Sequence, residues 1–218
     1  MGLFDIFKGK TKDSADNSNK NTVGWDAIEN ELKKVYGDQK AMHYSPEVYY
    51  SLGGNDPLDG LSIYYNKSTN HYHYVTYGFT ELYDKESEIL GQSGWGFELT
   101  FRLKANKEDG DYPTWPLNLL KNIALTTFND EILFDEYHTL NSGPLRESRE
   151  TEITGILFVK DPQLTEQESQ NGKFKFLQIV GLTEEEYSGI TSKAIDRREF
   201  ISNLSKSNPL LITDIDRK

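Results

Sequence analysis

The sequence predicts an α+β domain in which a mixed β-sheet packs against helices. Short runs of aromatic and β-branched residues, each bounded by turn residues, indicate strands. Apolar residues that recur at spacings of three and four indicate amphipathic helices before and after those strands. With 218 residues, of which 36% are hydrophobic, the chain is long enough to bury a substantial core. We therefore expect one folded domain, at residues 23–218.

The first residues differ in composition from the rest of the chain. Residues 9–22 have one alanine as their only apolar side chain, so they cannot offset the entropy of ordering. An apolar tip precedes them at residues 3–7. We expect residues 1–22 to form a disordered leader.

The domain is expected to begin with a helix. Trp25, Ile28 and Leu32 recur at spacings of three and four, and the pattern continues to Tyr36. Gly37 follows, and glycine readily adopts the left-handed conformation that ends many helices. We expect an amphipathic helix over residues 25–36.

Strands are expected after this helix. We place them at residues 48–50, 61–65, 72–77 and 95–103. The last strand alternates clearly, so that it has one apolar face and one polar face. Its apolar face carries Phe97, Leu99, Phe101 and Leu103, and its polar face carries Glu98, Thr100 and Arg102. We expect the apolar face to lie in the core and the polar row to be either solvated or buried as a charged pair.

Helices and strands also alternate in the second half of the chain. Pro116 stands near the first turn of a helical pattern that runs to Phe128. Residues 153–159 and 174–180 are expected strands, and the polar residues 161–172 between them are an expected loop.

The end of the chain contains a helix start signal. Thr183 and Glu186 have the spacing of a capping box. We expect an interrupted helix from there that ends before Pro209, followed by a final strand at residues 210–213.

Composition excludes several classes of function. The chain has no cysteine, which excludes disulfides, thiolate metal sites and thiol catalysis. Its formal net charge of −11 and the lack of a basic patch argue against nucleic-acid binding. No apolar run approaches the ~20 residues that span a bilayer, and no secretion signal is present. We expect a cytoplasmic protein that binds neither nucleic acid nor membrane.

The sequence contains no motif that predicts catalysis or a cofactor. It has no phosphate-binding loop, dinucleotide-binding glycine pattern, nucleophile elbow or paired-histidine zinc motif. His71 and His73 project to the same side of a predicted strand, a spacing that two metal ligands could use, but a third ligand is not visible. We expect half-buried strand histidines, no metal, no cofactor and no enzyme activity.

Three blocks of sequence together resemble one family. They are residues 52–64 (LGGNDPLDGLSIY), 94–103 (GWGFELTFRL) and 113–116 (PTWP), and residues 161–163, 176–181 and 211–214 follow in the family's order. This pattern resembles the suppressor of fused family over residues 25–215. The resemblance implies an α+β domain with a mixed sheet, no catalytic activity and a role in holding a protein partner.

The resemblance also suggests what kind of partner to expect. A stand-alone domain of this size is similar to bacterial members of the family, which implies an immunity protein that binds and neutralises a cognate toxin. An acidic domain rich in aromatic residues would suit a basic toxin. Two alternatives remain: an adaptor or chaperone that sequesters an endogenous regulatory protein, and an enzyme of unknown chemistry.

Five residues are the predicted partner contacts. Asp56 and Asp59 lie in the glycine-rich turn at residues 53–60, where they either face a partner or support the turn. The aromatic candidates are Tyr64, Trp95 and Trp115, and core packing is the alternative role for both tryptophans.

Overall fold

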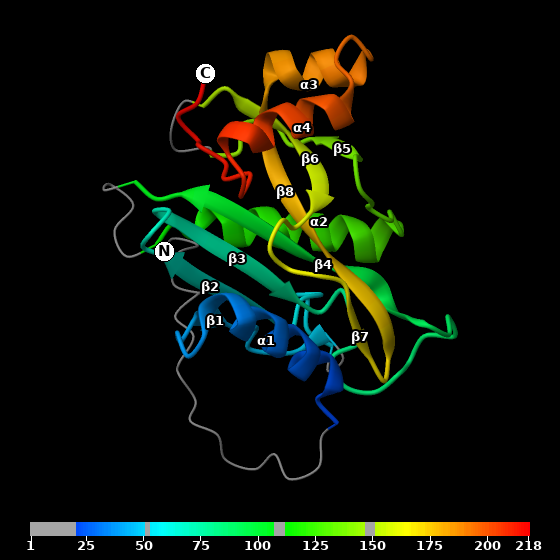
Figure 1. Cartoon of the computed structure of the whole chain (residues 1–218). Helices are drawn as coiled ribbons and strands as arrows, with labels where there is room; N and C mark the ends of the chain where they lie inside the picture. The colour runs from blue at the N-terminus through cyan, green and yellow to red at the C-terminus, as the bar shows by residue number, and fades with distance from the viewer. Residues whose placement is uncertain (1–20, 51–52, 107–111, 147–150) are drawn as a thin grey trace, which may run out of the picture.

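The structure is a computed structural model that describes residues 21–50, 53–106, 112–146 and 151–218. Over these ranges it is a mixed sheet with helices on both faces (Figure 1). The expected α+β class is confirmed. Of the leader expected at residues 1–22, residues 1–20 lie outside the described ranges.

The elements follow one another largely as the periodicity predicts. The first half contains α1 (Val23–Tyr36), β1 (Met42–Tyr44), β2 (Gly60–Asn66), β3 (His71–Tyr77), β4 (Gln92–Lys104) and α2 (Trp115–Asp130). The second half contains β5 (Thr139–Asn141), β6 (Ile153–Lys160), β7 (Gln167–Ser169), β8 (Gly172–Thr183), α3 (Glu184–Thr191) and α4 (Arg197–Ser207). Gly37 ends α1 with a positive φ of 59°, and Thr183 and Glu186 form the expected capping box.

The sheet is mixed because one central pair of strands is parallel. The strand order is β1-β2-β3-β4-β8-β6-β5, with β7 paired to β8. Only β4 and β8 run parallel, with Phe101 opposite Ile179, while every other described pair is antiparallel. The central strands β4 and β8 are therefore flanked on both sides.

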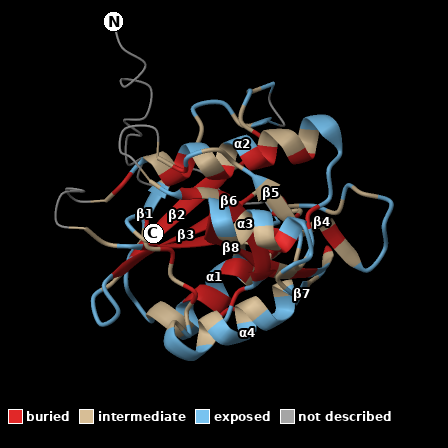
Figure 2. Ribbon diagram, turned by 90° about the horizontal axis from the view of Figure 1, so that it is seen from above, coloured by how far each residue is buried: buried red, intermediate tan, exposed pale blue. Residues whose placement is uncertain are grey.

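Helices bury both faces of this sheet. α2 packs on one face, where it meets the apolar face of β4. α1 covers part of the opposite face, and α3 and α4 cover the rest over β6 and β8. Figure 2 shows the buried residues concentrated in the layer between these helices.

The apolar face of β4 lies in the core as predicted, but its polar face is buried too. Phe97, Leu99, Phe101 and Leu103 are at most 1% exposed. Glu98, Thr100 and Arg102 are 0% exposed. The prediction that Glu98 and Arg102 are either solvated or form a charged pair is wrong, because each is buried with partners of its own.

Two short strand predictions and one loop prediction are corrected. At residues 48–50 only Tyr49 makes an isolated bridge, to Asp56, because the chain turns back and Gly54 donates to the Tyr49 carbonyl. At residues 210–213 only Thr213 makes a bridge. There the Asn208 side chain bonds both backbone groups of Ile212 and curls the segment. The loop expected at residues 161–172 contains β7.

Candidate functional site

A pocket of about 240 Å³ lies beside the start of β2, the end of β3, the start of β4 and the end of α2. It brings together two of the predicted partner contacts, Asp59 and Trp95. Its aromatic lining consists of Tyr50, Phe79, Tyr83, Trp95 and Phe128, and its acidic lining of Asp59, Glu81, Asp84 and Glu86. Below, this is called the Trp95 pocket.

The aromatic side of the pocket is centred on Phe128 of α2. The Phe128 ring lies 5.6 Å from Trp95, 5.9 Å from Phe79 and 5.9 Å from Tyr50, measured between ring centroids. Trp95 is partly exposed and Tyr50 is 45% exposed. The aromatic rings therefore pack against one another on Phe128, while Trp95 and Tyr50 remain accessible to solvent.

Two glycines fix the position of Trp95. Gly94 and Gly96 have φ of 50° and 80°, a conformation that L side chains rarely adopt. A Cβ atom on Gly94 would lie 2.4 Å from the carbonyl oxygen of Phe79. This close approach lets the Trp95 amide donate to the same carbonyl, at 2.8 Å. The sequence Gly-Trp-Gly is thus what allows Trp95 to line the pocket.

The loop that follows β3 forms one wall of the pocket, and Glu98 holds this loop in place. Its carboxylate accepts hydrogen bonds from Thr76 Oγ1 (2.6 Å), the Gly78 amide (3.0 Å), and both the amide (2.9 Å) and Oγ1 (2.7 Å) of Thr80. Burial raises the pKa of Glu98 to about 7, against the effect of these hydrogen bonds. Glu98 is therefore a positioning residue beneath the pocket.

A second carboxylate and an amide hold the rest of this wall. Glu81 accepts from Lys85 Nζ (2.7 Å) and from the amides of Gly94 (3.1 Å) and Glu86 (2.8 Å). Asn171, from the turn before β8, donates to the carbonyls of Glu81 (2.8 Å) and Tyr83 (2.9 Å). The wall is thus tied to the body of the domain by side chains, which preorganises the pocket.

The remaining acids give the pocket an unbalanced negative charge. Asp84 and Glu86 are exposed, and no Lys or Arg is among the described residues that line the pocket. Asp59 hydrogen-bonds with Tyr83; burial raises the pKa of Tyr83, and the Asp59 carboxylate adds to that rise. The pocket therefore combines an aromatic surface with anionic groups.

The other three predicted contacts lie outside this pocket. Asp56 pairs with Lys121 of α2 at 2.8 Å and accepts from the Leu58 amide at 3.2 Å. Tyr64 is buried and stacks on Tyr36 of α1, with ring centroids 4.1 Å apart. Trp115 lies edge-on to Phe101, at 5.7 Å. All three have neighbours within the domain, and their part in partner binding stays a prediction.

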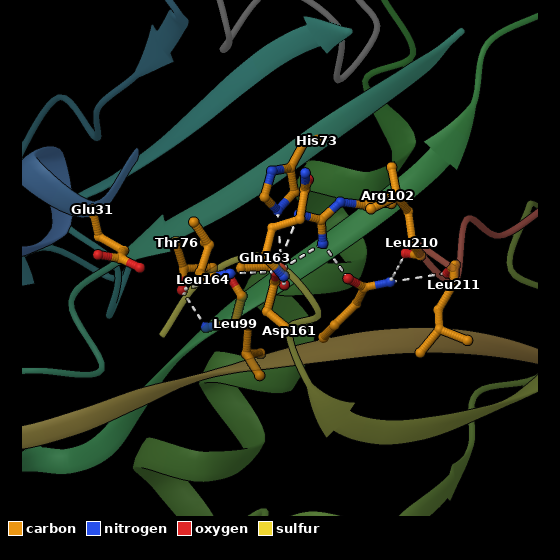
Figure 3. A network of polar contacts seen from close by, with 12 residues as sticks. Glu31, His73, Thr76, Leu99, Arg102, Asp161, Gln163, Leu164, Leu210 and Leu211 are labelled. Carbon is orange, nitrogen blue, oxygen red and sulfur yellow. Dashed lines mark hydrogen bonds and ion pairs between the residues drawn. The ribbon is translucent and has the colours of Figure 1, made fainter. Parts of the chain in front are cut away.

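A separate polar network lies under α1 and the 161–164 segment, on the polar face of β4 (Figure 3). Asp161 accepts from Thr100 Oγ1 (2.7 Å), Arg102 Nη2 (3.1 Å) and the Gln163 amide (2.8 Å). Arg102 also donates to Gln178. The Asp161 and Arg102 side chains are both 0% exposed.

The network connects parts of the chain that are distant in sequence. Gln178 of β8 donates to the carbonyls of Leu210 (2.8 Å) and Leu211 (2.9 Å). His73 of β3 lies 3.3 Å from Asp161, and its other ring nitrogen bonds the Tyr36 hydroxyl of α1 at 2.7 Å. The network therefore fastens α1, three strands and the C-terminal segment to one another.

The histidines belong to this interior, which corrects the expectation that they are half-buried. His71 and His73 are 0% exposed. Burial and the charge of Arg102 lower the pKa of His73 to about 4. Burial also opposes ionisation of Asp161, but Arg102 and His73 outweigh it and hold the Asp161 pKa well below its usual range. The arrangement is a neutral imidazole beside a buried ion pair.

Sequence reasoning missed most of the pocket. Phe128 and Tyr50 come from segments far from Trp95 in the sequence, so only the tertiary structure brings them together. A sequence signal was present for the acids, because Asp84, Glu86 and Glu88 place a carboxylate at every second position of one segment. Among the described residues, no group of His, Asp or Glu side chains is arranged to hold a metal ion. None of the described helices is long and apolar enough to cross a membrane.

Comparison with known families and curated proteins gives a consistent result. The family model described as "Suppressor of fused protein (SUFU)" matches residues 54–218. The human and mouse proteins called Suppressor of fused homolog are each 36% identical to the chain over 209 residues. These matches cover 89% of this chain but 43% of each relative. The chain thus spans less than half the length of the curated relatives it matches.

Comparison with solved structures shows the same similarity. A chain from the crystal structure of the Sufu–Fu complex superposes with a TM-score of 0.81 at 28% identity, covering 91% of this chain and 92% of that one. The crystal structure of Drosophila Suppressor of Fused gives a TM-score of 0.79 at 28% identity, covering 94% of this chain and 53% of that one.

Proposed function

The chain belongs to the suppressor of fused family, and on this premise we propose that it is a non-catalytic domain that binds one protein partner through the Trp95 pocket. The observation that carries the proposal is the pocket itself, in which Trp95, Tyr50 and Phe128 stand beside unbalanced carboxylates. Tryptophan and tyrosine are enriched in the residues that dominate protein interfaces.

A similar structure supports a partner of this kind. One of the chains that superpose on this domain was solved in the Sufu–Fu complex, so that relative assembles with another protein. Its matched part is nearly the whole of that chain. A chain of similar extent in that complex supports a partner-binding role for this domain.

We propose that the partner has a basic surface. The chain carries a formal net charge of −11, and a field of that sign speeds encounter with a cationic protein. A basic toxin that the domain neutralises is the first partner class to test. Sequestration of an endogenous regulatory protein is the alternative, and the identity of the captured protein separates the two.

The test is capture of the partner from the native host. The full chain carrying an affinity tag is used as bait at low salt, and the bound protein is identified. We expect one basic protein at a stoichiometric level, and a growth defect caused by that protein alone that co-expression of the domain relieves. Failure to capture a partner, together with turnover of a small molecule by the purified domain, would refute the proposed function.

A further inference from the structure

We infer that the Trp95 pocket binds the guanidinium group of an arginine side chain that the partner presents. The inference rests on the proposed function and adds the chemistry that the pocket recognises. The size of the pocket is the first reason. At about 240 Å³ it is smaller than the roughly 300–1,000 Å³ of pockets that enclose small-molecule ligands. A single long side chain matches it better than a metabolite does.

The charge of the pocket is the second reason. Glu81 is occupied, because Lys85 Nζ lies 2.7 Å from its carboxylate and backbone amides bind the same group. The single positive charge of Lys85 is matched by Glu81, and its remaining donors bond Ser87 and the Gln92 carbonyl. The carboxylates of Asp59, Asp84 and Glu86 therefore supply the negative charge.

The contacts of Asp84 and Glu86 leave acceptor capacity for a ligand. Asp84 accepts only a long hydrogen bond of 3.3 Å from Asn21 among the described residues. Glu86 has no side-chain partner within the ranges that the structure describes. An ionised carboxylate has room for several donors. Two exposed carboxylates near one opening are thus poised to receive N–H groups.

The aromatic lining is the reason to choose guanidinium over ammonium. Trp95 and Tyr50 expose ring surface at the opening. A guanidinium is planar and weakly hydrated, so it stacks on aromatic rings while its edge forks to carboxylates. An ammonium is a compact, strongly hydrated charge that gains less from such a surface. The combination of ring faces and acids therefore favours arginine.

The direct test uses two small probes that differ mainly in charge. N-acetyl-arginine amide and the neutral N-acetyl-citrulline amide are titrated into the isotope-labelled domain, and the indole N–H signal of Trp95 is followed by NMR. Substituting Trp95→Phe assigns that signal among the 3 tryptophans. We expect a saturable shift with arginine that citrulline does not produce, and that weakens as salt rises, because exposed charges are screened.

A matched pair of variants tests the role of the acids. Glu86 lines the pocket, whereas Glu88 is an exposed acid in the same segment that does not line it. We expect Glu86→Gln to weaken arginine binding by about threefold, the size expected from one exposed charge pair, and Glu88→Gln to leave it unchanged. Equal binding of citrulline, tighter binding of N-acetyl-lysine amide, equal effects of the two variants or no saturable Trp95 shift would overturn the inference.

Failure of this inference is distinguishable from failure of the proposed function. If a protein is captured and Tyr50→Ala weakens its binding but Glu86→Gln does not, the pocket binds the partner through another chemistry, and only the inference is wrong. If the arginine probe binds as expected but no protein is captured and the purified domain turns over a small molecule, the guanidinium chemistry of the pocket stands and the proposed function fails.

Discussion

Removing the charge of Asp161 should destabilise the domain more than removing any exposed acid. The carboxylate is the counter-charge of Arg102, and both side chains are 0% exposed. It also accepts from Thr100 Oγ1 and from the amides of Gln163 and Leu164. An asparagine keeps the shape but leaves a buried guanidinium without an anion. Breaking a buried pair in this way costs about 3–5 kcal/mol.

The assay is urea unfolding of Asp161→Asn at neutral pH, followed by tryptophan fluorescence. Asp135→Asn is the matched control, because Asp135 pairs with Lys175 on the surface and its side chain is 55% exposed. That variant should lose about 1 kcal/mol or less. The double variant Arg102→Met, Asp161→Asn should lose less than the sum of its single variants. Equal losses for Asp161→Asn and Asp135→Asn would refute the view that the network fastens the domain.

Further predictions concern His73 of β3 and the two faces of β4. Burial lowers the pKa of His73 from 6.5 to about 4, so the unfolded state binds the proton first, and this histidine makes the free energy of unfolding fall as pH drops from 6.5 to 4. The raised pKa of Glu98, about 7, acts oppositely: its stabilisation is present below 4.5 and is lost as pH rises through 7. In denaturant titrations across this pH range, the free energy of unfolding of Glu98→Gln should therefore fall more steeply than that of the parent as pH drops. A shallower fall would contradict these two pKa shifts. Phe101→Ala should cost about 3–5 kcal/mol and Thr100→Ala about 1–2 kcal/mol; the reverse order would mean that the faces of β4 are misassigned.

The sequence predicted the elements whose residues repeat with a clear period. Phe97, Leu99, Phe101 and Leu103 showed the core face of β4 without any structure. The three-residue strands β1 and β5 were missed, because neither is long enough to show alternation. The polar face of β4 was misjudged because its cover comes from α1 and from residues after Asp161, which no local pattern reveals.

The candidate site was only partly predictable for the same reason. Asp59 and Trp95 were among the predicted contacts, and the pocket unites them. Phe128 of α2, which packs on Trp95, and Tyr83, which hydrogen-bonds Asp59, are distant from them in sequence. Asp56 has the acidic character expected of a contact, but an ion pair with Lys121 engages it. Residue type can suggest a contact, whereas exposure and internal partners depend on the tertiary structure.

The most direct test of the central claim is the affinity of the captured partner for two tyrosine variants. Tyr50 lines the Trp95 pocket and is 45% exposed, whereas Tyr65 on β2 is 41% exposed and lies outside it. We predict that Tyr50→Ala raises the dissociation constant by about tenfold or more, as loss of an aromatic interface anchor does, while Tyr65→Ala changes it by less than about twofold. Equal effects, or a larger effect of Tyr65→Ala, would contradict the assignment of partner binding to the Trp95 pocket.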